Sequence, residues 1–332
     1  MCRANGICFC LIAVFLCWGS VYGEDVSFRP DRDFVSLFDS KSLAGWTGAL
    51  DGYAVEDGTL VCLPGKQGNL LTEKEFADFI LKFEFKLTPG ANNGLGIRCP
   101  NRAEGNLHLD GIELQILDDT ADKYQSLKPY QYHGSVYGLV PARQGALKPV
   151  GEWNQQEVTV QGQRIKVVLN DSVIVDADLN EATKSGTLDG QNHPGLLRGR
   201  GHIGFLGHGD RVEFRKLQIN ERPVTTTTDS LDQVKQRLAS KQALLLDVRE
   251  ESEWQDGHVA GAISLPISKI QQGLDDESLL KILAKEKIIY AYCGGGRRSL
   301  IVANQLSKRG YDIRPLGSGI QGLLEAGFAK SK

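Results

Sequence analysis

Apolar and polar side chains alternate along much of the first two thirds of the chain. The clearest example is residues 81–87, where apolar and charged residues take turns, as in a strand that buries one face. Further strand-like runs follow at short intervals between residues 35 and 219, and no helical periodicity of useful length interrupts them. Many short strands over such a length favour an all-β sandwich of the jelly-roll type.

Turn residues predict how these strands are connected. Gly162 separates residues 156–160 from residues 164–169, and Asn170-Asp171 leads into residues 173–177, so two consecutive hairpins are expected. A Gly-His-Gly-Asp turn at residues 207–210 predicts another hairpin, formed by the strands on either side of it.

Residues 105–119 predict a turn followed by a strand that ends at Leu117. Side chains alternate between the two faces of a strand. The residues expected on the buried face are Ile112, Leu114 and Ile116, and those expected on the other face are Glu113, Gln115 and Leu117. A carboxylate beside an amide on an open face is typical of sugar-binding sheets, although an ordinary solvated polar face has the same pattern. Asp118 is expected to shape the turn after the strand.

The pattern changes after residue 222. Residues 223–228 have no apolar periodicity and are expected to form a linker. Beyond them apolar strands alternate with helices, the first of which is capped around Ser230. The other expected elements are strands at 243–248, 262–265, 287–292 and 313–316, and helices at 277–285, 298–308 and 320–326. This alternation predicts a second domain, residues 229–332, with an α/β fold and a parallel sheet.

Composition narrows the class of protein. The chain has 332 residues and a net charge of −3, which fits two globular domains and provides no electrostatic basis for binding nucleic acid. Four of the seven cysteines lie in the first 17 residues, so the cysteines do not form a disulfide framework. The sequence leaves open whether Cys62 and Cys99 pair.

The N-terminal 23 residues have the features of a secretory signal. Arg3 supplies the positive start, an apolar run follows, and small residues stand near position 23. The apolar run is too short to span a bilayer comfortably, so we expect no membrane span after signal removal. The mature protein is therefore expected to be exported, into the periplasm or outside the cell.

The sharpest chemical feature is a loop between a buried strand and a helix. Its residues are Cys293, Gly294, Gly295, Gly296, Arg297 and Arg298. Glycines let successive N–H groups face inward, and the helix start and the arginines add positive charge. Such a site lowers the pKa of a thiol, favours the nucleophilic thiolate and suits a bound anion or persulfide.

About residues 229–330 resemble the rhodanese family. The matching residues are Asp247-Val248-Arg249, Glu253-Trp254, residues 257–262 leading to Pro266, the Cys293 loop, residues 316–320, and Ala326-Gly327-Phe328. The resemblance implies that Cys293 carries a persulfide, taking sulfur from a donor such as thiosulfate, and that Arg298 closes the loop. A six-residue loop favours sulfur transfer over phosphate hydrolysis, which related enzymes perform with a longer loop.

About residues 33–221 resemble the 3-keto-disaccharide hydrolases, also described as 3-keto-glucoside lyase/hydratase domains. The matching stretches are Leu37-Phe38-Asp39, Gly45-Trp46, Asn92-Asn93-Gly94, Gly96-Ile97-Arg98, residues 113–118, His133-Gly134, Tyr137-Gly138, Trp153-Asn154, Gly204-Phe205, His208-Gly209 and residues 212–215. The resemblance implies a concanavalin A-like jelly roll, here residues 30–222, that acts on a 3-keto-glycoside.

The implied reaction needs a base, a stabiliser for the enolate and an acid for the leaving group. Glu113 is the candidate base, or alternatively a metal ligand, with Gln115 beside it. Arg98 is expected on the same strand face as Gly94 and Gly96, from where it would reach the groove and hold the enolate unless a divalent metal does so. His133 and His208 are candidates for an acid, a metal ligand or a sugar contact.

Other residues have weaker functional signals. His108 and His193 show no paired ligand spacing and are expected to be ordinary loop residues. Trp153 suits a sugar ring and a hydrophobic core equally well. Arg249 and His258 are expected to support the fold.

Three functions fit these observations. The first is an exported bifunctional enzyme that cleaves 3-keto-glycosides and transfers sulfur through Cys293. In the second, a non-catalytic carbohydrate-binding sandwich tethers the sulfurtransferase. In the third, the rhodanese part is a sulfur sensor without turnover.

Overall fold

The structure is a computed structural model that describes Met1 and residues 33–102 and 105–332. The predicted signal peptide, residues 1–23, therefore lies outside the described residues apart from Met1. In the described part of the chain, no helix is both long enough and apolar enough to cross a membrane.

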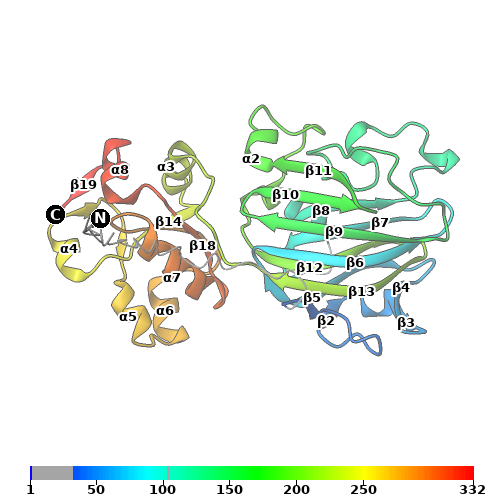
Figure 1. Cartoon of the computed structure of the whole chain (residues 1–332), viewed down its shortest axis with the longest axis horizontal. Coiled ribbons are helices and arrows are strands. Elements are labelled where there is room, and N and C mark those ends of the chain that lie inside the picture. The colour runs from blue at the N-terminus through cyan, green and yellow to red at the C-terminus, as the bar shows by residue number, and fades with distance from the viewer. Residues whose placement is uncertain (2–32, 103–104) are drawn as a thin grey trace. The chain divides into compact units, whose positions relative to one another are not determined.

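Two antiparallel sheets form the N-terminal domain (Figure 1). The larger sheet contains, in spatial order, β11 (Ser172–Asp178), β10 (Arg164–Leu169), β9 (Trp153–Gln161), β6 (Phe79–Leu87), β13 (Val212–Glu221), β4 (Thr59–Cys62) and β3 (Tyr53–Glu56), and β1 (Val35–Ser36) also pairs with β13. The smaller sheet contains β2 (Trp46–Gly48), β5 (Gln67–Phe76), β12 (Gly201–His208), β7 (Asn92–Cys99) and β8 (Ile112–Leu117). The predicted all-β sandwich and the two consecutive hairpins of β9, β10 and β11 are thus confirmed.

The predicted hairpin around residues 207–210 is wrong. β12 pairs with β5 and β7 in the smaller sheet, whereas β13 pairs with β4 and β6 in the larger one. The turn therefore carries the chain from one sheet to the other. Phe205 and Phe214 stack with their ring centroids 3.7 Å apart, and this apolar contact between the sheets replaces the backbone pairing of a hairpin.

One face of β8 belongs to the sandwich core, as its pattern predicts, because Ile112, Leu114 and Ile116 are buried there. The opposite face is not open, contrary to the expectation for an edge strand. Glu113 is only 6% exposed and Gln115 only 5% exposed. Residues outside the predicted strands cover this face, including α1 (Leu107–Asp110), whose Leu107 packs in an apolar cluster with residues of β5, β7 and β12.

His133 lies in the sandwich core, and the structure does not place it in an open groove. Its ring stacks on Phe85 with the centroids 5.0 Å apart. Its Nδ1 accepts the backbone N–H of Leu117 at 3.2 Å, and its Nε2 lies 3.1 Å from Oε1 of Gln156. Because Nδ1 is an acceptor, Nε2 carries the proton that is donated to Gln156. Burial lowers the pKa of His133 to about 4, against a smaller opposing effect of the Gln156 contact.

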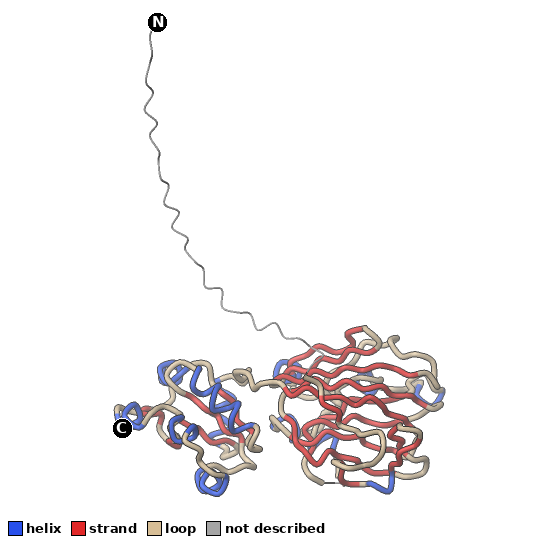
Figure 2. Tube along the Cα trace, turned by 60° about the horizontal axis from the view of Figure 1, so that its bottom comes forward, coloured by secondary structure: helices blue, strands red, loops and turns tan. Residues whose placement is uncertain are grey.

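The C-terminal domain has the predicted parallel sheet with helices on both faces (Figure 2). Its strands, in spatial order, are β16 (Ile263–Ser264), β14 (Ala243–Asp247), β17 (Ile288–Tyr292) and β18 (Asp312–Pro315), and β15 (His258–Val259) pairs separately with β19 (Lys330–Ser331). Its helices are α3 (Leu231–Ala239), α4 (Glu251–Gln255), α5 (Ile267–Gln271), α6 (Asp276–Ile282), α7 (Arg297–Ser307) and α8 (Gly319–Glu325). Ser230 caps α3 through a capping box with Gln233, as expected.

A buried carboxylate ties this sheet to α3. Asp229 accepts hydrogen bonds from Arg237, from the Tyr290 hydroxyl at 2.6 Å and from Arg314 at 2.8 Å. Burial alone would raise the pKa of Asp229, but Arg314 and Arg237 outweigh it and hold the pKa far below its usual range. The cluster therefore joins the start of α3 to β17 and β18.

We expect the contribution of His133 to the stability of the sandwich to fall as the pH falls from about 6.5 to about 4. The unfolded chain binds a proton at His133 with an ordinary pKa of about 6.5, whereas the folded chain resists protonation down to about pH 4. The contribution of His133 to the free energy of unfolding is fully present above pH ~6.5, and about 3 kcal/mol of it is lost by pH ~4. Urea unfolding at a series of pH values measures it. Glu113 has a raised pKa and therefore an opposite pH dependence, so the test is the difference in stability between the wild type and His133→Asn, which retains an acceptor near Nδ1. This difference should change by about 3 kcal/mol between pH ~6.5 and pH ~4, to the disadvantage of the wild type, and a constant difference would contradict the assignment.

Asp229→Asn should destabilise the C-terminal domain by about 3–5 kcal/mol, because it leaves the buried Arg237 without a carboxylate and removes one of the two carboxylates that bind Arg314, which keeps Asp312. Since the folded pKa of Asp229 is depressed, its stabilisation is present above pH ~4 and is lost at lower pH. Urea unfolding of the full chain measures the change. Asp232→Asn, at an exposed position of the same helix, is the matched control and should change stability by less than about 0.5 kcal/mol.

Candidate functional site

The Cys293 loop connects β17 to α7, the context that the sequence predicts. The backbone N–H of Gly296 donates to Sγ of Cys293 at 3.1 Å. Gly319, at the start of α8, packs against the loop so closely that a Cβ there would lie 2.2 Å from the carbonyl oxygen of Gly294. The turn before α8 therefore supports the loop from outside, and only glycine fits this position.

The surroundings of the sulfur favour its thiolate form. Burial by itself raises the pKa of Cys293, but the backbone N–H groups of Ser299, Gly295 and Arg298 and the Ser299 hydroxyl outweigh it. The pKa of the thiol therefore lies below its ordinary value. A thiolate held by backbone donors at a helix start is a nucleophile.

Arg298 lies over this loop and is fixed by a carboxylate. Its guanidinium donates two hydrogen bonds to Glu253 of α4, and the one to Oε1 measures 2.8 Å. A Cβ on Gly294 would lie 3.2 Å from Nη2 of Arg298, which places the guanidinium beside the loop backbone. The bidentate pair lowers the pKa of Glu253 to about 2. Arg297, by contrast, is exposed.

In the sandwich, Glu113 lies on the face of β8 that points away from the core. Its backbone pairs with Gly96, and a Cβ on Gly94 would lie 2.0 Å from Oε1 of Glu113. The missing side chain of Gly94 thus provides the room for the carboxyl group. Oε1 is buried and has no hydrogen-bond partner among the described residues.

Burial raises the pKa of Glu113 to about 8. The carboxyl group is therefore mostly protonated near neutral pH, in contrast to the carboxylate that the sequence suggested. A buried acid with a pKa near the working pH is suited to proton transfer in either direction.

A further chain segment extends the sheet beyond β8 and brings aromatic side chains to Glu113. The N–H of Tyr137 donates to the carbonyl of Glu113 at 2.9 Å, and Val136 pairs with Leu114. This antiparallel register places Tyr137 opposite Glu113 on the same face. His108 of α1 packs edge-on against the Tyr137 ring, with the centroids 5.6 Å apart.

The next residues connect Glu113 to a buried histidine and aspartate. Gly138 accepts the backbone N–H groups of Leu188 and Asp189, and Asp189 lies 2.9 Å from Nε2 of His193. The pKa of His108 is lowered, chiefly by burial and then by His193. His108 is therefore within electrostatic reach of this pair.

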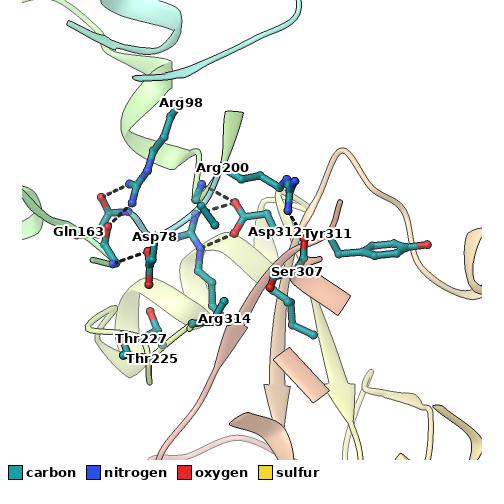
Figure 3. Close-up of a pocket in the computed structure, with 15 residues that line it drawn as sticks. Asp78, Arg98, Gln163, Arg200, Thr225, Thr227, Ser307, Tyr311, Asp312 and Arg314 are labelled. Carbon is teal, nitrogen blue, oxygen red and sulfur yellow. Dashed lines mark hydrogen bonds and ion pairs between the residues drawn. The ribbon is translucent and has the colours of Figure 1, made fainter. Parts of the chain in front are cut away.

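Arg98 does not reach Glu113, contrary to the sequence-based expectation. It has a φ of +53°, a conformation that breaks the alternation of side chains along β7. Its guanidinium donates to Gln163 at 3.2 Å and to the carbonyl of Gly162, as Figure 3 shows, and the side chain is buried. Arg98 therefore fixes the loop between β9 and β10.

The remaining candidates take different positions. Gln115 lies on the same face as Glu113, and its amide nitrogen donates to Asn92 at 2.9 Å. His208 is exposed at the end of β12. Asp118 accepts the N–H of Gly90 and contacts Thr120, so its predicted role in shaping the turn is confirmed. Cys62 and Cys99 are both free and buried, so they do not pair.

Within residues 33–102 and 105–332, no three or more His, Cys, Asp or Glu side chains come together in a group that could hold a metal ion. The neighbours of Glu113 do not supply a ligand set, so we assign no step to a metal.

Sequence reasoning missed Tyr137, Asp189 and the association of His108 with His193. The two histidines are 85 positions apart in the sequence, and their loops have no periodic pattern. The available signal was the Tyr137-Gly138 pair, because Gly138 has a φ of +75° and a Cβ there would lie 2.4 Å from Oδ2 of Asp189.

Comparisons with known proteins agree with this architecture. Residues 33–220 match the model of the 3-keto-alpha-glucoside-1,2-lyase-like domain, and residues 230–326 match that of the rhodanese-like domain. A 3-keto-disaccharide hydrolase of Bacteroides thetaiotaomicron is 25% identical over 243 residues, which are 59% of this chain and 81% of that protein. A crystal structure from Parabacteroides distasonis, provisionally named a glycosyl hydrolase, is 28% identical with a TM-score of 0.51, covering 57% of this chain and 99% of its own.

The C-terminal domain has its own relatives. A mitochondrial protein of Schizosaccharomyces pombe, provisionally named a thiosulfate sulfurtransferase, is 33% identical over 84 residues, which are 23% of this chain and 59% of that protein. The match of a family model to more than half of the chain settles its membership. The chain belongs to the 3-keto-alpha-glucoside-1,2-lyase-like family and carries a rhodanese-like domain at its C-terminal end.

Proposed function

We propose that the sandwich cleaves 3-keto-glycosides and that the C-terminal domain transfers sulfur through Cys293. For the sandwich, the observation that carries the proposal is the buried carboxyl group of Glu113, which lies over Gly94 without a partner for Oε1. A buried acid without a partner costs stability, and such groups concentrate at functional sites. The similarity to a 3-keto-disaccharide hydrolase supports the substrate class.

The chemistry follows from the keto group at C3 of the sugar. It acidifies the proton on C2, so a base can remove that proton while the oxygen on C1 leaves with its bonding electrons. Water then adds to the resulting enone, and the net reaction is hydrolysis. Glu113 is the proton-transfer group, and Gln115 and His208 are candidate contacts to the sugar from the same region of the smaller sheet.

For sulfur transfer, the proposal rests on the backbone donors around Sγ of Cys293. The thiolate attacks the outer sulfur of thiosulfate, sulfite leaves with the electrons of the broken S–S bond, and the persulfide remains on Cys293. A thiophilic acceptor such as cyanide then removes the outer sulfur. Arg298, held by Glu253, provides positive charge for the anionic donor. The N-terminal sequence pattern supports export of the protein, which we propose as well.

Glu113→Gln should lower the rate of aglycone release from a 3-keto-glucoside by about 100-fold or more, because an amide cannot transfer the proton. The fold should persist, since Gln has the same shape as the neutral acid. Chromatography of released aglycone with the full chain measures the effect. Glu157→Gln, at a partly exposed position on the larger sheet, is the matched control and should retain the wild-type rate. Equal rates for Glu113→Gln and the wild type would overturn the assignment.

Cys293→Ser should abolish thiocyanate formation from thiosulfate and cyanide, because a serine hydroxyl forms no persulfide. Thiocyanate is measured by its colour with ferric ion. Cys62→Ala removes a free thiol in the other domain and should leave the rate unchanged. Equal rates for Cys293→Ser and wild type would exclude sulfur transfer at this loop.

A further inference from the structure

We propose that Asp189 and His193 form a second proton-transfer group of the sandwich, in which His193 is the base and Glu113 is the acid. This inference deepens the proposed sugar-cleaving function and rests on it. It assigns His193 to the proton on C2 of the sugar and Glu113 to the leaving oxygen on C1.

The hydrogen bond between the two residues defines which nitrogen of His193 is available. Oδ2 of Asp189 lies 2.9 Å from Nε2 of His193, and the two side chains are only 4% and 1% exposed. The pKa of Asp189 is lowered despite its burial, by the N–H of Gln191 and by His193, so the group is a carboxylate. A carboxylate only accepts, so Nε2 must carry the hydrogen.

The other ring nitrogen is unoccupied. Nδ1 of His193 is buried and has no hydrogen-bond partner among the described residues. With the hydrogen on Nε2, the neutral ring presents the lone pair of Nδ1, as a general base requires. The aspartate holds this tautomer and stabilises the cation that forms when Nδ1 takes a proton.

A short series of backbone contacts connects this pair to the strand that carries Glu113. Tyr137 is opposite Glu113 in the sheet, and the following residue, Gly138, touches both members of the pair. A Cβ on Gly138 would lie 2.4 Å from Oδ2 of Asp189 and 3.0 Å from Cε1 of His193. Oε1 of Glu113 and Nδ1 of His193 are both buried and without partners among the described residues, and the segment of Tyr137 and Gly138 connects the strand of one to the loop of the other.

The two groups offer a proton donor and a free ring nitrogen. Glu113 is protonated in its apolar surroundings and can donate, whereas His193 can accept. Nδ1 takes the proton from C2, the C1–C2 double bond forms, and the C1–O bond breaks. The leaving oxygen keeps the bonding electrons and receives the proton of Glu113. Water then adds at C1, giving one proton to the Glu113 carboxylate, and His193 returns its proton to C2, so both groups regain their starting states.

Leaving groups of different acidity separate the two roles. We compare full-length variants on two 3-keto-glucosides, one with 4-nitrophenol and one with methanol as the leaving group. Nitrophenolate leaves without a proton donor, whereas methoxide needs one. Glu113→Gln should therefore lower the rate of aglycone release from the methyl glycoside by about 100-fold or more, and the factor for the nitrophenyl glycoside should be at least ten times smaller. His193→Gln should lower the rate of aglycone release from both substrates by about 100-fold or more, because both reactions need removal of the C2 proton.

Two further variants distinguish a loss of catalysis from a loss of the folded structure. His202→Gln removes another buried histidine of the sandwich, whose Nδ1 donates to the carbonyl of Thr72, and should keep the wild-type rates. Asp189→Asn keeps the size of the side chain and should lower the rate about tenfold or more while moving the acidic limb of the pH–rate profile. A purely structural pair would not move that limb.

Each outcome decides one proposal. If the wild type releases neither aglycone, the sugar-cleaving function fails. If the wild type is active but folded His193→Gln and Asp189→Asn retain its rates and pH profile, the function stands and the assignment of His193 falls. If the nitrophenyl substrate rescues His193→Gln and not Glu113→Gln, the two roles are the reverse of those proposed.

Discussion

The hydrogen bonds along the outer edge of β8 are the contact on which the sandwich site depends. β8 is the last strand of its sheet, and residues 134–137 extend it through bonds such as that from Tyr137 to Glu113. This pairing satisfies the edge of the sheet and closes it to other strands. It also determines which side chains lie beside Glu113 and directs the chain toward the Asp189–His193 pair. The register of residues 134–137 against β8 thus determines both where the sheet ends and which residues form the candidate site.

The two domains show opposite outcomes of the same physical effect. Burial disfavours the charged form of an acidic group wherever it occurs. At Cys293 the inward-facing N–H groups of the loop outweigh burial, so the pKa of the thiol falls. At Glu113 the glycine beneath the carboxyl group, Gly94, makes room for it but directs no donor at its Oε1, so the pKa rises to about 8. The number of hydrogen-bond donors around each group, more than its depth, decides its proton state.

Arginines in this protein have mainly structural partners. Arg98 is bound to Gln163 and Gly162, and Arg237 and Arg314 share the carboxylate of Asp229. Arg298 is different, because its carboxylate partner leaves it at the mouth of the Cys293 loop. An arginine in a family motif is therefore a good candidate for a functional residue when a neighbouring carboxylate holds its side chain at the site. It is a poor candidate when its own backbone conformation directs the side chain elsewhere.

The sequence by itself determined the class of both domains and the position of the Cys293 loop between a strand and a helix. The periods of two residues in strands and of about 3.6 residues in helices are local patterns, so each can be recognised in a short stretch of sequence. The strand, the glycines and the helix start around Cys293 follow one another directly in the chain, so all the parts of the loop lie within a few residues of Cys293. Only the tertiary structure decided that β12 and β13 belong to different sheets, that Arg98 points away from Glu113 and that Asp189 and His193 meet beside Gly138. These outcomes depend on packing between sheets, on one positive φ and on loop contacts between distant residues, none of which leaves a periodic pattern in the chain.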